Sequence, residues 1–247
     1  MPAEQKFPDC ELGRNVVTKY CSKEVLDSML RGELWFGSLL KYRKCETDNG
    51  LMSDFYEGLT TRLVDFQHSQ QPFTGKVSQL NIIKQMGASI APGTGAIGFK
   101  REIDKFIFCT SWGPYSRSHH QKMMHGSQDF PDYKGEPNND HFIVIDIPTF
   151  ENAVLGWCAS IYGAAQIRHA PCIYCKDRQC PLDKSEHESG RIDENKTAII
   201  KPDNFRIENE YRFLIQIPNR PPSISDDTLK MKSMNLTTSF LAYGQYN

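Results

Sequence analysis

The chain has 247 residues, of which 39% are hydrophobic and 11% aromatic, so it can bury a substantial core and is not disordered as a whole. With 29 basic and 30 acidic residues the formal net charge is -1, which gives no global field for collecting nucleic acid or an anionic membrane. A local charged patch stays possible, so net charge does not decide the substrate.

The sequence predicts a cytoplasmic protein with no membrane span. No apolar run reaches the roughly 18–20 residues that cross a bilayer, and the opening MPAEQKFPDCELGR lacks the apolar region of a secretory signal. Eight cysteines in such a chain are expected to be reduced, most of them as small core residues.

The first predicted elements are a strand in NVVTKY and a helix in SKEVLDSMLRGEL. The helix is indicated by apolar residues at helical spacing, with Ser22 to cap its start and Gly32 to end it. The following LWFGSLLKYR suits a strand or a short buried turn. From residue 48 to 100 the signals are weak: LVDF and LNII are possible strands, and GASIAPGTGAIGF is expected to be flexible.

In the second half of the sequence, predicted strands and helices alternate less regularly. KFIFCTSW and HFIVIDIP predict strands, the polar stretch between them a helix or loop, and TFENAVLGWCASIY an amphipathic helix. Further strands are expected in AAQIRHAPCIYC and RIENEYRFLIQI, with a turn at NRPP and a tail containing SFLAY. Because strands and helices do not alternate strictly, we expect an α+β fold, and because no linker or repeat is found, a single domain spanning 1–247.

Two glutamates stand two residues apart in FRIENEYRFLI. In a continuous strand Glu208 and Glu210 would point to the same face, about 7 Å apart. Such a pair repels itself, so either the face is solvated, with Arg206 or Arg212 as partner, or something cationic belongs there.

Three separated segments are candidates for chemistry: Thr18-Lys19-Tyr20, Cys109-Thr110-Ser111-Trp112 and Glu208-Asn209-Glu210. In this order they resemble the mono-ADP-ribosyltransferase superfamily, in which a first strand supplies an Arg or His to NAD, a second a Ser-Thr-Ser stretch, and the last the catalytic Glu. KYCS, FIFCTSW and KPDNFRIENEYRFLI also resemble an uncharacterised bacterial family, often encoded beside defence genes, with Lys-Tyr near the start and Glu-x-Glu-Tyr-Arg near the end. The resemblance implies a transferase-like split sheet with flanking helices and long loops.

The resemblance assigns a role to each residue, with NAD as the substrate. Glu210 would stabilise the positive charge that develops on the ribose as the bond to nicotinamide breaks, and Glu208 would orient or deprotonate the acceptor. Thr110 and Ser111 would contact the ribose or orient Glu210. Lys19 would take the place of the Arg or His, and three tyrosines are candidates to stack on nicotinamide: Tyr20, Tyr42 and Tyr56.

The chain departs from the superfamily pattern at two positions. Cys109 replaces the first Ser of Ser-Thr-Ser, and Lys19 cannot give the bidentate recognition of an arginine. These departures bear on NAD binding more than on the glutamate pair.

The implied function is modification of a macromolecule, with RNA or DNA slightly favoured over protein, by a toxin or anti-phage effector that an antitoxin would accompany. An NAD glycohydrolase would need the same Glu210 and no acceptor. A different class is a non-catalytic module, held by zinc, that binds nucleic acid or protein.

The zinc alternative rests on Cys172, Cys175 and Cys180, completed by His169 or His187. One CxxC pair is an incomplete signal, and the same residues fit a strand followed by a loop. Separately, His119, His120 and His125 are candidates to bind a metal ion or a phosphate group. Arg117 and Lys122 beside Tyr115 suit single-stranded nucleic acid, although a solvated loop carries such residues too.

Overall fold

The computed structural model describes residues 15–39, 59–65, 96–102, 105–131, 133–176, 179–181, 186, 193–218 and 228–246. The chain forms two compact units. The first comprises Met1–Gly37, Phe106–Pro171 and Ile207–Asn247, and the second Ser38–Lys105 and Cys172–Arg206. The single-domain expectation remains a prediction.

The first unit is built on an eight-stranded sheet whose neighbouring strands are antiparallel wherever their register is defined. Its main path runs β12-β2-β5-β1-β6-β13, and β11 joins β5 to β7. The bounds are β1 Val16–Cys21, β2 Glu33–Ser38, β5 Phe106–Trp112, β6 His141–Asp146, β7 Gln166–Pro171, β11 Glu210–Gln216, β12 Thr228–Lys232 and β13 Phe240–Gln245. The expected α+β class with a mostly antiparallel sheet is confirmed.

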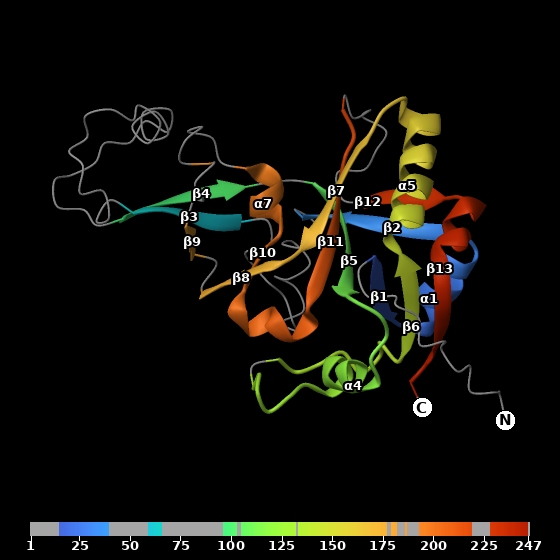
Figure 1. Ribbon diagram of the computed structural model, residues 1–247, viewed down its shortest axis with the longest axis horizontal. Helices are drawn as coiled ribbons and strands as arrows, with labels where there is room; N and C mark the ends of the chain where they lie inside the picture. The colour runs from blue at the N-terminus through green and yellow to red at the C-terminus, as the bar shows by residue number, and fades with distance from the viewer. Residues whose placement is uncertain are drawn as a thin grey trace. The chain divides into compact units, whose positions relative to one another are not determined.

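The sheet divides at β5. Strand β11 pairs with β5 from Phe106 to Ser111 along one edge, so β1 and β2 must share the other edge, with β1 at Ser111 and Trp112. Figure 1 shows the two branches running in different directions, β2 with β12 across the view and β1 with β6 and β13 steeply through it. The end of β5 is therefore where both branches and β11 meet.

The core lies on one face of this sheet. Helix α5 (Ile147–Tyr162) buries Phe150 and Val154 against Phe108 and Phe213. Two further elements add apolar residues to the same cluster, α1 (Lys23–Leu30) and the 3-10 helix η3 (Met234–Ser239). Helix α5 begins where the Asp146 carboxylate accepts the Thr149 N–H at 3.0 Å, and α4 (Arg117–His125) ends at Gly126.

The second unit has two smaller sheets. Strand β3 (Leu59–Asp65) pairs antiparallel with β4 (Ala96–Glu102) and parallel with β9 (Gln179–Pro181), and β8 (Ile173–Cys175) pairs parallel with β10 (Ile200–Pro202). Helix α7 (Glu194–Ala198) starts at Asp193, whose carboxylate accepts the N–H groups of Asn195 and Lys196. The 3-10 helix η2 (Asp203–Glu208) continues the chain into the first unit.

Three local predictions need correction. The strand expected in RIENEYRFLIQI starts only at Glu210, because Arg206 to Glu208 are in η2 and Asn209 has φ 45°. Since regular strand alternation fails at that left-handed residue, it does not place Glu208 and Glu210 on one face. The Gly-rich segment expected to be flexible contributes Ala96 to Phe99 to β4.

The strand expected in AAQIRHAPCIYC is two strands, because the chain passes from β7 to β8 at Cys172, directly after Pro171. Ser22 occupies the N-cap position of α1 without a side-chain capping hydrogen bond. Part of LVDF is in β3, while LNII and NRPP lie outside the described residues.

Gly32 does end the first helix, as predicted, and its substitution is expected to be costly. Its φ is 74°, and a Cβ there would lie 2.5 Å from the Ser233 carbonyl oxygen. Gly163 ends α5 with φ 77° and open space around the same position. We expect Gly163→Ala to lower the free energy of unfolding by about 1–2 kcal/mol from backbone strain alone, and Gly32→Ala by about 3–4 kcal/mol because overpacking adds to it. Urea unfolding of both variants measures the difference, and equal losses would show that the backbone at Ser233 yields.

Candidate functional site

Three of the predicted segments converge at the divided end of β5. In the antiparallel registers Thr18 of β1 stands opposite Ser111 of β5, and Ser111 stands opposite Glu210 of β11. Residues directly opposite in such pairs share a face, so Thr18, Ser111 and Glu210 form a row across three neighbouring strands. These positions are about one hundred residues apart in the chain at each step, and strand pairing alone brings them together.

The Glu210 carboxylate is buried and hydrogen-bonded. Its Oε1 accepts a hydrogen bond from Arg212 Nε at 2.6 Å, and the two side chains are 5% and 1% exposed. The Cys109 thiol lies beside this pair, and burial together with the Glu210 charge raises the pKa of Cys109 well above its usual range. The site therefore holds a buried carboxylate, oriented by its hydrogen bond from Arg212, beside a neutral thiol.

Three hydrogen bonds hold the segment Glu208-Asn209 at the end of β5, and a fourth joins β1 to the residue after β5. Ser111 Oγ donates to the Glu208 carbonyl at 2.8 Å, and the Trp112 N–H donates to the Asn209 carbonyl at 2.8 Å. Asn209 Nδ2 donates to the Trp112 carbonyl at 3.0 Å, and Thr18 Oγ1 donates to the Gly113 carbonyl at 2.9 Å. The main chain is thus fixed on both sides of Asn209, while the Glu208 side chain is partly exposed.

Lys19 and Thr110 lie on the opposite face from Glu210. Each directly adjoins a member of the row, and neighbouring side chains of a strand point to opposite faces. Lys19 Nζ lies 5.7 Å from the centroid of the Phe108 ring on the core side, and Thr110 Oγ1 donates to the Tyr211 carbonyl at 3.0 Å. The structure therefore brings Ser111 and Glu210 together and separates Lys19 and Thr110 from them.

Tyr20 is 5% exposed and joins β1 to α4. His119 Nε2 lies 2.8 Å from the Ile207 carbonyl, which can only accept, so Nε2 carries the proton and Nδ1 accepts the Tyr20 hydroxyl at 3.2 Å. Burial raises the pKa of Tyr20, which keeps the hydroxyl protonated as the donor. Its ring lies 4.6 Å from that of His120, so Tyr20 packs inside this cluster.

His120 repeats the arrangement of His119. Its Nε2 donates to the Asn139 carbonyl at 2.6 Å, and Nδ1 lies 3.4 Å from the Tyr115 hydroxyl. Burial lowers the pKa of both histidines below the ordinary value of 6.5.

This pair makes stability depend on pH. As the pH falls below about 6.5, the unfolded chain binds protons that the folded chain excludes, so the free energy of unfolding is expected to decrease until the folded pKa values are passed. Urea unfolding at pH 7.5, 6.5 and 5.5 tests this. His120→Asn should flatten the decrease, whereas His125→Asn, at an exposed position, should leave it unchanged. Stability that stays level or rises between pH 6.5 and 5.5 would contradict the assignment.

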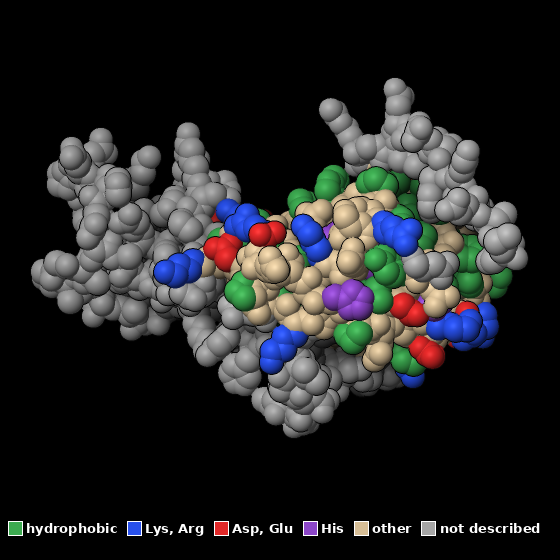
Figure 2. All heavy atoms as spheres, turned by 90° about the horizontal axis from the view of Figure 1, so that it is seen from below, with side chains coloured by type: hydrophobic (Ala, Val, Ile, Leu, Met, Phe, Trp, Pro, Cys, Tyr) green, Lys and Arg blue, Asp and Glu red, His purple; other side chains and the backbone are tan. Residues whose placement is uncertain are grey.

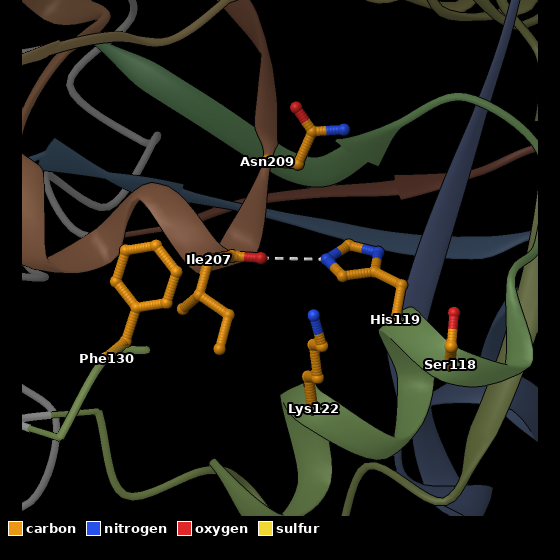
Figure 3. Close-up of a pocket in the computed structure, with 6 residues that line it drawn as sticks. All are labelled: Ser118, His119, Lys122, Phe130, Ile207 and Asn209. Carbon is orange, nitrogen blue, oxygen red and sulfur yellow. Dashed lines mark hydrogen bonds between the residues drawn. The ribbon is translucent and has the colours of Figure 1, made fainter. Parts of the chain in front are cut away.

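A pocket of about 200 Å³ opens beside this cluster (Figure 3). Its lining residues are Ser118, His119, Lys122, Phe130, Ile207 and Asn209. The sequence indicated the basic residues of α4, but Phe130 and Asn209 carried no signal of their own. Asn209 was visible only as the residue between two glutamates.

A second hydrogen-bonded chain was missed because its members are far apart in sequence. Burial raises the pKa of Tyr211 to about 12, so its hydroxyl stays protonated. With the His169 proton on Nε2, towards the Glu151 carboxylate, Nδ1 accepts the Tyr211 hydroxyl at 2.5 Å. His169 Nε2 then donates to Glu151 Oε2 at 3.3 Å. The Tyr211 ring stacks on that of Trp112 with centroids 4.7 Å apart. These hydrogen bonds link α5 to β7 and β11, and Tyr211 directly follows Glu210 of the row.

Among the described residues, the structure shows no arrangement of ligands that supports the zinc alternative. Cys172 is buried and Cys175 half-buried, and the side chains of Cys180 and His187 lie outside the described residues, as do Tyr42 and Tyr56. Within the described part of the chain, no group of three His, Cys, Asp or Glu residues is arranged to hold a metal ion.

The molecular surface in Figure 2 is seen from below the view of Figure 1. In the middle of this view a histidine and several basic side chains are exposed, and acidic side chains lie towards the two sides. Among the described residues no helix is long and apolar enough to cross a membrane.

Comparison of the chain with protein-family models, with curated proteins and with solved structures found no match in any of the three.

Proposed function

We propose that this chain is an NAD-dependent mono-ADP-ribosyltransferase that modifies a macromolecule, with the ADP-ribosyltransferase-like split sheet as its scaffold. The observation that carries the proposal is the row Thr18-Ser111-Glu210, because it unites the three segments on which the resemblance rests. The division of the sheet at β5, directly at this row, also supports it.

Glu210 has the properties that the reaction requires of its carboxylate. The bond from nicotinamide to the ribose breaks with its electron pair leaving on nicotinamide, and positive charge develops on the ribose ring. A carboxylate already desolvated and held by Arg212 needs little reorganisation to stabilise that charge. A nucleophile of the acceptor then forms the new bond to the same ribose carbon and gives up its proton, for which Glu208 is the proposed base.

The proposal places NAD against the face that carries the row. Ser111 lies opposite Glu210 and is the proposed contact for the ribose. Lys19 and Thr110, on the other face, and Tyr20, packed against the histidines, remain predictions as NAD contacts. The implied role as a toxin or anti-phage effector, with an antitoxin as partner, belongs to the same proposal.

The test is incubation of the purified chain with NAD labelled in its ADP-ribose part and a cell lysate, followed by separate nuclease and protease digestion. We expect label on a macromolecule, RNA or DNA before protein, and a decrease of about 10²–10³-fold in Glu210→Gln, which removes the charge that the transition state needs. Glu210→Asp keeps the charge beside Arg212 and separates loss of geometry from loss of folding. Glu24→Gln makes the same chemical change at an exposed site of α1 and should be fully active.

The outcomes are distinct. Free ADP-ribose without a labelled macromolecule would identify an NAD glycohydrolase. A folded wild-type chain that neither consumes NAD nor transfers label would overturn the proposal and favour the binding module. Glu208→Gln is expected to reduce transfer while NAD hydrolysis continues, since its proposed role concerns the acceptor alone.

A further inference from the structure

The pocket on α4 contains two polar groups that the described parts of the chain leave without partners. Lys122 Nζ forms no hydrogen bond or ion pair with any described residue, and Figure 3 shows it directed towards the space between Ile207 and His119. Asn209 uses Nδ2 to bind the Trp112 carbonyl, so its Oδ1 is available as an acceptor. The pocket thus offers a cation from Lys122, while in Figure 3 the Asn209 amide points away from Lys122 and Phe130.

Phe130 adds an aromatic surface. Its side chain is half-buried, and its ring contacts no other aromatic ring among the described residues. In Figure 3 the ring stands beside Ile207 at one end of the pocket, opposite Ser118. A planar ligand can therefore stack on Phe130 beside Ile207, within reach of the side of the pocket where Lys122 lies.

The charge around the pocket favours an anion. Helix α4 has the sequence RSHHQKMMH and contains no acidic residue, while Arg117, Lys122 and His125 are exposed on it. The acidic side chains closest along the chain are the exposed Asp129, next to Phe130, and the two glutamates on either side of Asn209. Glu208 is partly exposed, and the Glu210 carboxylate is buried against Arg212. None of them lines the pocket.

The size of the pocket limits what can enter. Its volume of about 200 Å³ is below the roughly 300–1,000 Å³ of sites that enclose a whole drug-sized ligand. One ring fits, with an attached anionic group at the rim. An aromatic platform with a nearby cation is the combination that binds single-stranded nucleic acid, in which every base has a stacking face and every linkage a negative charge.

We propose that this pocket binds one nucleotide of a single-stranded RNA or DNA, with the base on Phe130 and the phosphate on Lys122. Duplex nucleic acid is excluded because its bases are stacked and cannot enter. Asn209 lies between Glu208 and Glu210, so a bound nucleotide is beside the candidate reaction site. That it is the acceptor rests on the proposed function, whereas the binding itself does not.

The experiment is fluorescence anisotropy with labelled single-stranded RNA and DNA oligonucleotides and a duplex control, over a range of salt concentrations and without NAD. We expect binding of the single strands. Phe130→Ala should weaken it about tenfold or more through lost stacking. Lys122→Ala should weaken it and reduce the slope of log K against log salt by about one.

Lys23→Ala is the matched control, since it removes one exposed lysine from α1, outside the pocket. No binding of single strands, tighter binding of the duplex, or equal effects of Lys122→Ala and Lys23→Ala would each overturn the proposal. Tighter binding of a phosphopeptide would do the same. If oligonucleotides bind but no label is transferred from NAD, the pocket stands and the transferase fails. If transfer survives unchanged in Phe130→Ala and Lys122→Ala, the nucleotide bound in the pocket is not the acceptor, and the transferase proposal stands without it.

Discussion

Removing either partner of the Glu210–Arg212 pair is expected to lower the free energy of unfolding by about 3–5 kcal/mol. Both side chains are almost completely buried, so Glu210→Gln removes the negative charge that faces the Arg212 guanidinium, and Arg212→Met removes the positive charge that faces the Glu210 carboxylate. The double variant should lose less stability than the sum of the two single losses, because the interaction between the two charges is lost only once.

A double-mutant cycle measured by urea unfolding tests this expectation. The coupling energy is the deviation of the double variant from the sum of the two single losses. The pair Lys23–Asp27 on α1 is the control, because its side chains are 66% and 43% exposed and it should contribute only about 0.3–0.5 kcal/mol. Losses below about 1 kcal/mol at Glu210 and Arg212 would mean that water reaches the pair.

The result also decides how activity data are to be interpreted. A Glu210→Gln variant that is inactive because it unfolds says nothing about catalysis, so Glu210→Asp is needed beside it. If Glu210→Asp folds normally and loses transfer, the carboxylate position matters for the reaction. The buried ion pair then both stabilises β11 and directs the carboxylate.

The strands and helices with strong local patterns were predictable. β5 begins with the apolar run Phe106–Cys109 and β6 contains the run Phe142–Ile145. α1 has its apolar residues at helical spacing and is followed by Gly32, as expected. The one-face interpretation of Glu208 and Glu210 was wrong because it assumed an unbroken strand. Asparagine tolerates φ 45° at Asn209, but nothing in the local pattern of the sequence requires it.

Only some of the residues of the site were predictable from the sequence. The order of the segments suggested that β1, β5 and β11 converge, but register decides which side chains share a face, and register depends on pairing between residues about one hundred positions apart. A shift of one residue would place Thr110 opposite Glu210 in place of Ser111. The same limitation hides the pocket, whose residues come from α4, the loop after it and the turn before β11.

The largest apolar effect is expected at Phe213, next to Arg212 but on the other face of β11. Its side chain is fully buried, and its ring lies 4.7 Å from that of Phe150 and 5.5 Å from that of Tyr211. Phe213→Ala should lower the free energy of unfolding by about 3–5 kcal/mol, because it removes buried apolar area and leaves a cavity between β11 and α5.

Ile161→Ala is the control, since Ile161 is 58% exposed near the end of α5 and its loss should change stability by less than about 0.5 kcal/mol. The comparison with Arg212→Met tells how β11 is held. Losses of similar size would mean that the strand depends equally on its apolar and its charged face. A large loss for Phe213→Ala beside a small one for Arg212→Met would instead mean that the core alone fixes β11, leaving the Glu210 carboxylate free to serve the reaction.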